Sequence, residues 1–136
     1  MSLNWPQPGL GHVPSYQASA QPFLTSSLGL PVSTSEPIKV SFLGVTRFVV
    51  VTNTESGATN IPIRFGFSAN GVKGVENNNY LVLNNGESFE AEFRVTEIFL
   101  LSDSTINTGT ASVAAGITDI PSKHLVNNWY GSSGIG

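Results

Sequence analysis

The chain has 136 residues, the length of one domain, and a net charge of −3 with only 11% charged residues, against about 25% in soluble domains. Its six basic residues stand singly, so the clustered phosphate contacts of a nucleic-acid-binding protein are not expected. Cysteine is absent, which excludes disulfides and thiolate chemistry, and no apolar run reaches about 18 residues, so no membrane span is expected.

Residues 1–35 combine aromatic side chains with a complete absence of charged ones. The segment also holds five prolines: Pro6, Pro8, Pro14, Pro22 and Pro31. Because proline fixes φ and lacks an N–H donor, neither a helix nor a central strand is expected, and we predict a long extended N-terminal arm. Disordered tails are normally charged and poor in aromatics, so we expect Trp5, Tyr16 and Phe23 to be interface anchors buried against a neighbouring subunit. The alternative is that these rings fold back onto the sandwich of their own chain.

Residues 36–122 are predicted to form one β-sandwich domain. Seven segments alternate apolar and polar side chains or are rich in β-branched and aromatic residues, both typical of strands. These segments are 38–42, 46–52, 61–67, 80–83, 88–95, 97–101 and 111–117. The pattern predicts an all-β fold, a single antiparallel β-sandwich or barrel of jelly-roll type. A helix over residues 88–101 is the competing interpretation, which the strict alternation there disfavours.

Polar segments are expected to connect these strands at 53–60, 69–79, 84–87 and 103–110. Gly44 is expected to mark a bulge or corner, and residues 84–87 a tight turn. Residues 69–79 read as a loop, with an Asn-Gly pair suited to positive φ. That loop either contacts a glycan or a neighbouring molecule, or is a plain connection.

Residues 123–136 are predicted to form a short C-terminal tail that resembles the N-terminal arm in composition. No charged residue follows Lys123, and Trp129 and Tyr130 precede a glycine- and serine-rich end. Both tryptophans of the chain, Trp5 and Trp129, thus lie in the terminal segments. We therefore add Trp129 and Tyr130 to the expected interface anchors.

Residues suited to catalysis or metal binding are few and scattered. His12 and His124 are the only histidines, and both fall in the terminal segments without a partner at a useful spacing. Asp103 and Asp119 are the only aspartates, whereas a calcium site needs several carboxylates at alternate positions. We therefore expect no catalytic, cofactor-binding or metal site, no small-molecule ligand, and no enzymatic activity.

Four glutamates, Glu87, Glu90, Glu92 and Glu97, form the densest run of charge in the chain. Glu90 and Glu92 share one face of a predicted strand, which is only superficially similar to the carboxylate pair of glycosidases. We expect a solvated face, balanced by Arg94 and by a cross-strand base such as Arg47 or Arg64.

Several short segments of the chain are similar to one group of known proteins. These are Asn4-Trp5 and the segments 8–17 (PGLGHVPSYQ), 38–42 (IKVSF), 45–47 (VTR), 66–72 (GFSANGV) and 131–136 (GSSGIG). Together they resemble small virion structural proteins encoded by marine viruses, chiefly tailed phages. The likeness covers nearly the whole chain, and its motifs are typical of assembly rather than of catalysis.

The resemblance implies a capsid component, either a decoration (cement) protein on the head or another small jelly-roll subunit. It further implies a position on the capsid surface of the virion, with the major capsid protein and copies of the same chain as partners, often in a homotrimer whose arms clamp neighbours. The alternative function is a carbohydrate-binding β-sandwich of a fibre or surface lectin, which exposed Trp or Tyr in loops 53–60 or 69–79 would support. Neither loop contains one. A hydrolase is a third class, for which the sequence offers no site.

Overall fold

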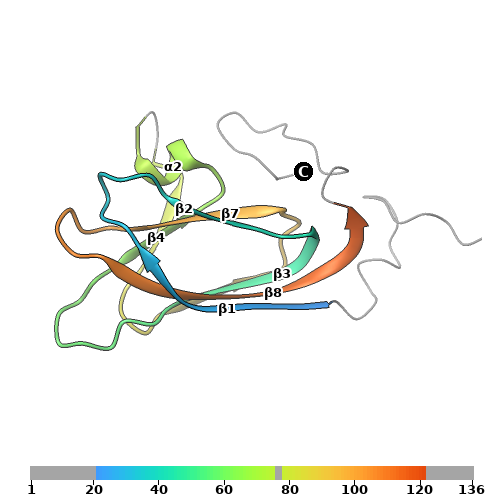
Figure 1. The fold of residues 1–136 in the computed structure, drawn as a ribbon, viewed down its shortest axis with the longest axis horizontal. Helices are drawn as coiled ribbons and strands as arrows, with labels where there is room; N and C mark the ends of the chain where they lie inside the picture. The colour runs from blue at the N-terminus through green and yellow to red at the C-terminus, as the bar shows by residue number, and fades with distance from the viewer. Residues whose placement is uncertain (1–20, 76–77, 122–136) are drawn as a thin grey trace, which may run out of the picture.

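Two antiparallel sheets of four strands each face one another in the computed structural model, which describes residues 21–75 and 78–121 (Figure 1). The first sheet has the order β1 (Gln21–Leu30), β8 (Gly109–Pro121), β3 (Gly44–Asn53) and β6 (Ser88–Ala91). The second has the order β2 (Ile38–Ser41), β7 (Glu97–Ser102), β4 (Ile63–Gly66) and β5 (Tyr80–Leu83). The predicted all-β, two-layered antiparallel fold is confirmed.

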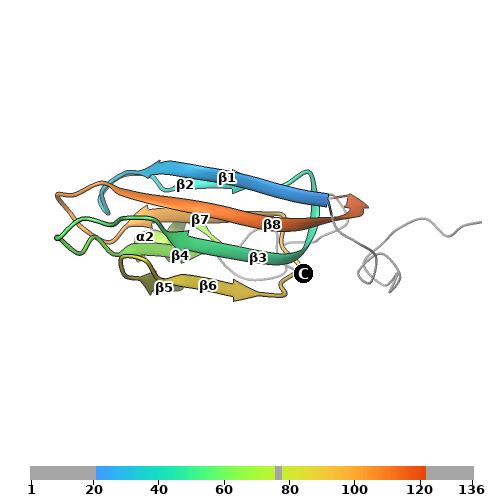
Figure 2. The same ribbon diagram turned by 90° about the horizontal axis from the view of Figure 1, so that it is seen from below.

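The strands pair in nested order along the chain, the first with the last and each following strand with the one before the last partner, so that the chain resembles one long hairpin folded into two sheets. β1 pairs with β8, β2 with β7, β3 with β6 and β4 with β5, and each sheet is completed by a second pairing of its long central strand, β8 with β3 or β7 with β4. Consecutive pairs therefore alternate between the sheets. As a result β1 and β2 lie along one side of the sandwich, and β5 and β6 along the other (Figure 2).

The core lies between the sheets and consists of alternate side chains of the paired strands. Val49 and Val51 of β3 point inward together with Val113 and Ala115 of β8, which follows from the period-2 geometry of a strand. The opposite sheet contributes Ile63, Phe65, Ile98 and Leu100. β7 is buried on both of its faces, because Phe99 and Leu101 contact Val72 on the outside of the sheet.

The covering residue Val72 belongs to a short helix, α2 (Ala69–Lys73), in the segment predicted to be a loop. Ser68 caps the helix by accepting a hydrogen bond from the Gly71 N–H at 3.1 Å, and Gly74 ends it with φ of 73°. Five residues are too few to show a helical period in the sequence, so only the Ser and Gly caps signalled this turn.

β1 lies inside the segment that was predicted to be an arm. Residues Gln21–Leu30 pair with β8, so the sandwich begins at Gln21 and not at the predicted boundary of residue 36. Pro22 is tolerated because β1 is an edge strand and Pro22 stands near its start. A bulge between Thr25 and Leu28, with Ser27 at a φ of 56°, interrupts the alternation that would have marked the strand.

The predicted strand over 88–95 ends early, at Ala91. Residues 92–96 carry the chain from one sheet to the other, held by Thr46, whose hydroxyl donates to the Phe93 carbonyl at 2.6 Å and accepts from the Val95 N–H at 3.0 Å. The tight turn before β6 is confirmed, since the Glu87 N–H donates to the Asn84 carbonyl at 2.9 Å and Gly86 has a φ of 78°. The competing helix over 88–101 is not formed.

Candidate interaction surfaces

Of the five predicted interface anchors, only Phe23 falls within the described residues. Its ring is half-buried and meets the ring of Phe42 edge-on, with 5.0 Å between centroids and an interplanar angle of 88°. Phe23 therefore packs on the core of its own chain, which is the alternative considered above for this residue. The other four, Trp5, Tyr16, Trp129 and Tyr130, lie outside the described residues.

Within residues 21–75 and 78–121 no group of three or more His, Cys, Asp or Glu side chains is placed to hold a metal ion. His12 and His124 lie outside this range. Glu90 is exposed on β6 opposite Val50. Arg64, one of the bases expected to balance the charge of Glu90, lies in the other sheet and donates a hydrogen bond to Asp103.

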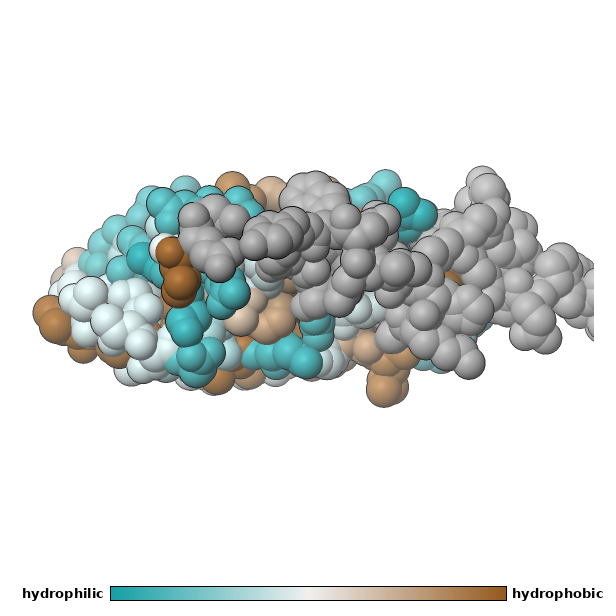
Figure 3. Space-filling view, turned by 90° about the horizontal axis from the view of Figure 1, so that it is seen from above, coloured by the Kyte–Doolittle hydropathy of each residue, from teal (hydrophilic) through white to brown (hydrophobic). Residues whose placement is uncertain are grey.

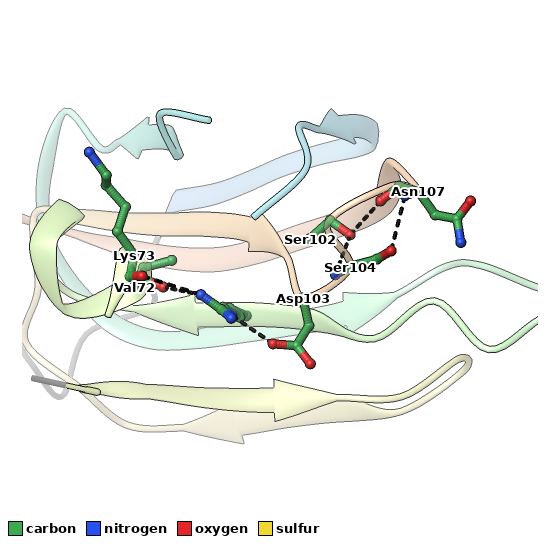
Figure 4. Close-up of polar contacts among 7 residues, drawn as sticks. Val72, Lys73, Ser102, Asp103, Ser104 and Asn107 are labelled. Atoms are coloured by element: carbon green, nitrogen blue, oxygen red, sulfur yellow. Dashed lines mark hydrogen bonds and ion pairs between the residues drawn. The ribbon is translucent and has the colours of Figure 1, made fainter. Parts of the chain in front are cut away.

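Arg64 is the centre of a polar cluster that fastens α2 to the second sheet. Its Nε donates to Asp103 Oδ1 at 2.7 Å, and one terminal nitrogen donates to the carbonyls of Val72 and Lys73 at 3.1 and 3.5 Å (Figure 4). The guanidinium also lies 4.5 Å from the ring centroid of Tyr80. These contacts satisfy carbonyls at the C-terminal end of α2, so the cluster has a structural role.

Substitution of Arg64 by lysine is expected to lower the free energy of unfolding by about 1–2 kcal/mol, because an ammonium group cannot reach Asp103 and the helix carbonyls together. Thermal denaturation followed by circular dichroism measures the change. Glu36→Gln is the matched control. It removes a more exposed ion pair, with 2.7 Å between Lys73 Nζ and Glu36 Oε1, and should cost less than about 0.5 kcal/mol. Equal losses in the two variants would contradict the role given to Arg64.

Asparagine side chains bind the loops at one end of the sandwich to one another. Asn53 Nδ2 donates to the carbonyls of Ile61 and Leu83, both at 2.9 Å, and Asn53 Oδ1 accepts from the Glu55 N–H at 3.0 Å. Asn85 Nδ2 donates to the Thr59 carbonyl, and its Oδ1 accepts from the Ile61 N–H. Asn60 and Asn84 are joined side chain to side chain. The asparagines of these loops therefore satisfy backbone and amide groups within the chain.

An aromatic pocket opens between β5 and β6, where the edges of the two sheets separate. It has a volume of about 320 Å³, and most of its lining is aromatic or apolar: Phe65, Phe67, Tyr80, Leu81, Phe89 and Phe93. Gly66 and the polar residues Asn78 and Asn79 complete the lining. Four of the rings form a connected set, with centroid distances from 5.3 Å (Phe65 to Phe67) to 6.0 Å (Phe89 to Phe93). No charged residue lines the pocket.

The side of the sandwich around this pocket exposes apolar side chains. Leu81 and Val82 of β5 are 47% and 44% exposed, and Phe93 is 39% exposed. β5 and β6 are both edge strands, so each has a second edge that pairs with no strand among the described residues. Exposed apolar edge strands are prone to pair with another polypeptide.

A second surface is the outer face of the first sheet. A row across it joins Leu24 of β1, Ala114 of β8 and Val50 of β3, and a shallow groove of about 260 Å³ runs along it. The groove is lined by uncharged side chains. Polar and apolar residues are also interspersed over the coloured part of the opposite face, which carries α2 (Figure 3).

No protein-family model matches this chain, and no curated protein sequence matches it. In the described part of the chain, no helix is long and apolar enough to cross a membrane.

Proposed function

We propose that this protein is a viral structural protein, a capsid decoration protein that binds the outer surface of the head and stabilises it through contacts between subunits. The strand order carries the proposal. The orders β1-β8-β3-β6 and β2-β7-β4-β5 support the interpretation of this sandwich as a jelly roll, an architecture of viral capsid proteins and lectins.

The N-terminal segment supports the structural role. Residues 1–20 carry no charged side chain but include Trp5, Tyr16 and three prolines, and they precede an edge strand of the sandwich. An extended segment of this kind gains stability by burying its rings against another subunit. The uncharged groove on the outer face of the first sheet, with Glu90 of β6 at the end of the same row of residues, offers a second contact surface for the major capsid protein. Copies of the chain would form a homotrimer, in which many modest contacts act together over the shell.

The lectin alternative is less well supported. Sugar-binding loops need free amide and carboxylate groups, often beside an exposed aromatic ring. Here the amides of Asn53, Asn60 and Asn85 are hydrogen-bonded within the chain. Neither loop 53–60 nor residues 69–79 contain Trp or Tyr.

Binding to capsids tests the proposal. The full chain and a chain that starts at Gln21 are each mixed with undecorated shells of the virus whose genome encodes the protein, and the bound fraction is measured by sedimentation. We expect the full chain to bind at a stoichiometry approaching that of the major capsid protein, and loss of residues 1–20 to weaken binding at least tenfold. Equal binding by both chains would show that residues 1–20 do not contribute to capsid binding. Failure of the full chain to bind, together with binding to a glycan array, would favour the lectin.

A further inference from the structure

We propose that the aromatic pocket between β5 and β6 receives the N-terminal segment, residues 1–20, of a second copy of this chain. The inserted ring is that of Trp5 or Tyr16. The inference rests on the proposed function, since it specifies the partner and the contact through which neighbouring subunits are joined.

The pocket fits an uncharged aromatic residue on an extended chain. Its volume of about 320 Å³ lies in the range of sites for small ligands, and its walls include four phenylalanine rings, which favour edge-on contact with another ring. Asn78 and Asn79 add amide groups that can bond to the backbone of an inserted chain. The exposed edge of β5 runs beside it, with Leu81 and Val82 half-exposed. An added strand could pair with that edge while its side chains enter the pocket, which is the geometry of β-augmentation.

Residues 1–20 match this site in chemistry and in length. They contain no charge, so their insertion buries no unpaired ion, and Pro6, Pro8 and Pro14 favour the extended backbone that an edge strand accepts. At about 3.3 Å per residue the segment spans up to roughly 65 Å, which exceeds the width of a four-stranded sheet.

The position of β1 favours a second copy over the chain's own pocket. β1 is the edge strand farthest from β6, with β8 and β3 between them. β1, which follows the arm, lies along one side of the sandwich, and β5 and β6 lie along the other (Figure 2). Residues of β5 and β6 line the pocket. When neighbours stand head to tail, the arm-bearing side of one faces the pocket side of the next, and such contacts form a closed ring when the rotation between neighbours closes.

A mixing experiment tests this arrangement. The first variant, Phe93→Asp, keeps the arm and places a carboxylate in the pocket. The second, Trp5→Ala with Tyr16→Ala, keeps the pocket and removes the rings of the arm. In analytical ultracentrifugation we expect the unmodified chain to form oligomers, each variant alone to be monomeric, and an equal mixture to form a one-to-one dimer through the single intact arm and pocket.

Control variants separate loss of docking from loss of folding. Ile106→Asp also places a carboxylate at an exposed apolar position, 83% exposed, but in the β7–β8 loop at the other end of the sandwich, and should leave the oligomer unchanged. Leu81→Asp enters the pocket from β5 and should reproduce the effect of Phe93→Asp. Circular dichroism must show cooperative melting for every variant. If one of the two pocket variants, Phe93→Asp or Leu81→Asp, fails to fold, the other takes its place.

Three results would overturn the inference. These are an oligomer unaffected by both pocket variants, a mixture that stays monomeric although each variant folds, and an unmodified chain that is monomeric at every concentration. A monomeric chain would also remove the homotrimer from the proposed function, but none of the three results contradicts binding to the capsid surface. The decoration role fails when the full chain does not bind capsids.

Discussion

Replacement of Asn53 by alanine is expected to lower the free energy of unfolding by about 2–4 kcal/mol. Asn53 is fully buried, and its side chain is the hydrogen-bond partner of the Ile61 and Leu83 carbonyls and of the Glu55 N–H. Alanine leaves these three groups without that partner. The contact with the Leu83 carbonyl is buried, and those with the Ile61 carbonyl and the Glu55 N–H are partly buried. Chemical denaturation in urea, with the slope compared between variants, measures the loss.

Two further substitutions make the test specific. Asn53→Asp keeps the shape but turns a donor into a carboxylate oxygen that faces two carbonyl oxygens, so it should be at least as destabilising as alanine. Asn60→Ala removes two exposed hydrogen bonds, one donated to Asn84 Oδ1 and one accepted from the Asn85 N–H, both at 3.0 Å, and should cost less than about 1 kcal/mol. If Asn53→Asp were as stable as the unmodified chain, the amide donor bonds would not be important for stability.

Phe65→Ala is expected to lower the free energy of unfolding by about 3–5 kcal/mol, which is a large part of the 5–15 kcal/mol typical of a domain. Phe65 is 1% exposed and is the largest fully buried side chain of the core. Its ring contacts those of Phe67 and Phe89, with centroids at 5.3 and 5.5 Å. Removing it leaves a cavity at the base of the aromatic pocket, and calorimetric melting measures the change.

Phe93→Ala is the matched control within the same set of rings. Phe93 contacts Phe67 and Phe89 at 5.7 and 6.0 Å but is 39% exposed, so its truncation should cost about 1 kcal/mol or less. A comparable loss for the two substitutions would show that the mouth of the pocket is as important to the fold as its base. Phe93 would then be unsuitable for testing docking, and Leu81→Asp would take its place.

Strict alternation predicted the strands well where one face of the strand is buried. Ile63 and Phe65 point into the core as their spacing indicated. The run of valines in 46–52 indicated a strand but not which of them, Val49 and Val51, would point inward. Strand β1 was not predicted, because Pro22 and Pro31 bracket it and the bulge at Ser27 breaks its period. These prolines stand near the start of the strand and just after its end, where they are tolerated, so the proline-free interval between them was the signal that could have revealed it.

The aromatic pocket was not predicted, because it depends on which strand edges meet. Phe65, Phe67, Phe89 and Phe93 each appeared to be inward residues of an ordinary strand. Only the pairing of the sheets brings β5 and β6 to the same side, and a pairing between distant segments leaves no local trace in a sequence. The spacing of the phenylalanines, two residues apart in one segment and four in the other, was the available hint.

The central position of β8 has a consequence for synthesis on the ribosome. β8 lies between β1 and β3, and Gln21 is opposite Ile117 in the pairing. The first sheet therefore cannot close until almost the whole chain has left the exit tunnel. At about 5–20 residues per second the nascent chain spends several seconds with the inner edges of β1 and β3 open, a period in which a polypeptide of low charge is vulnerable to aggregation.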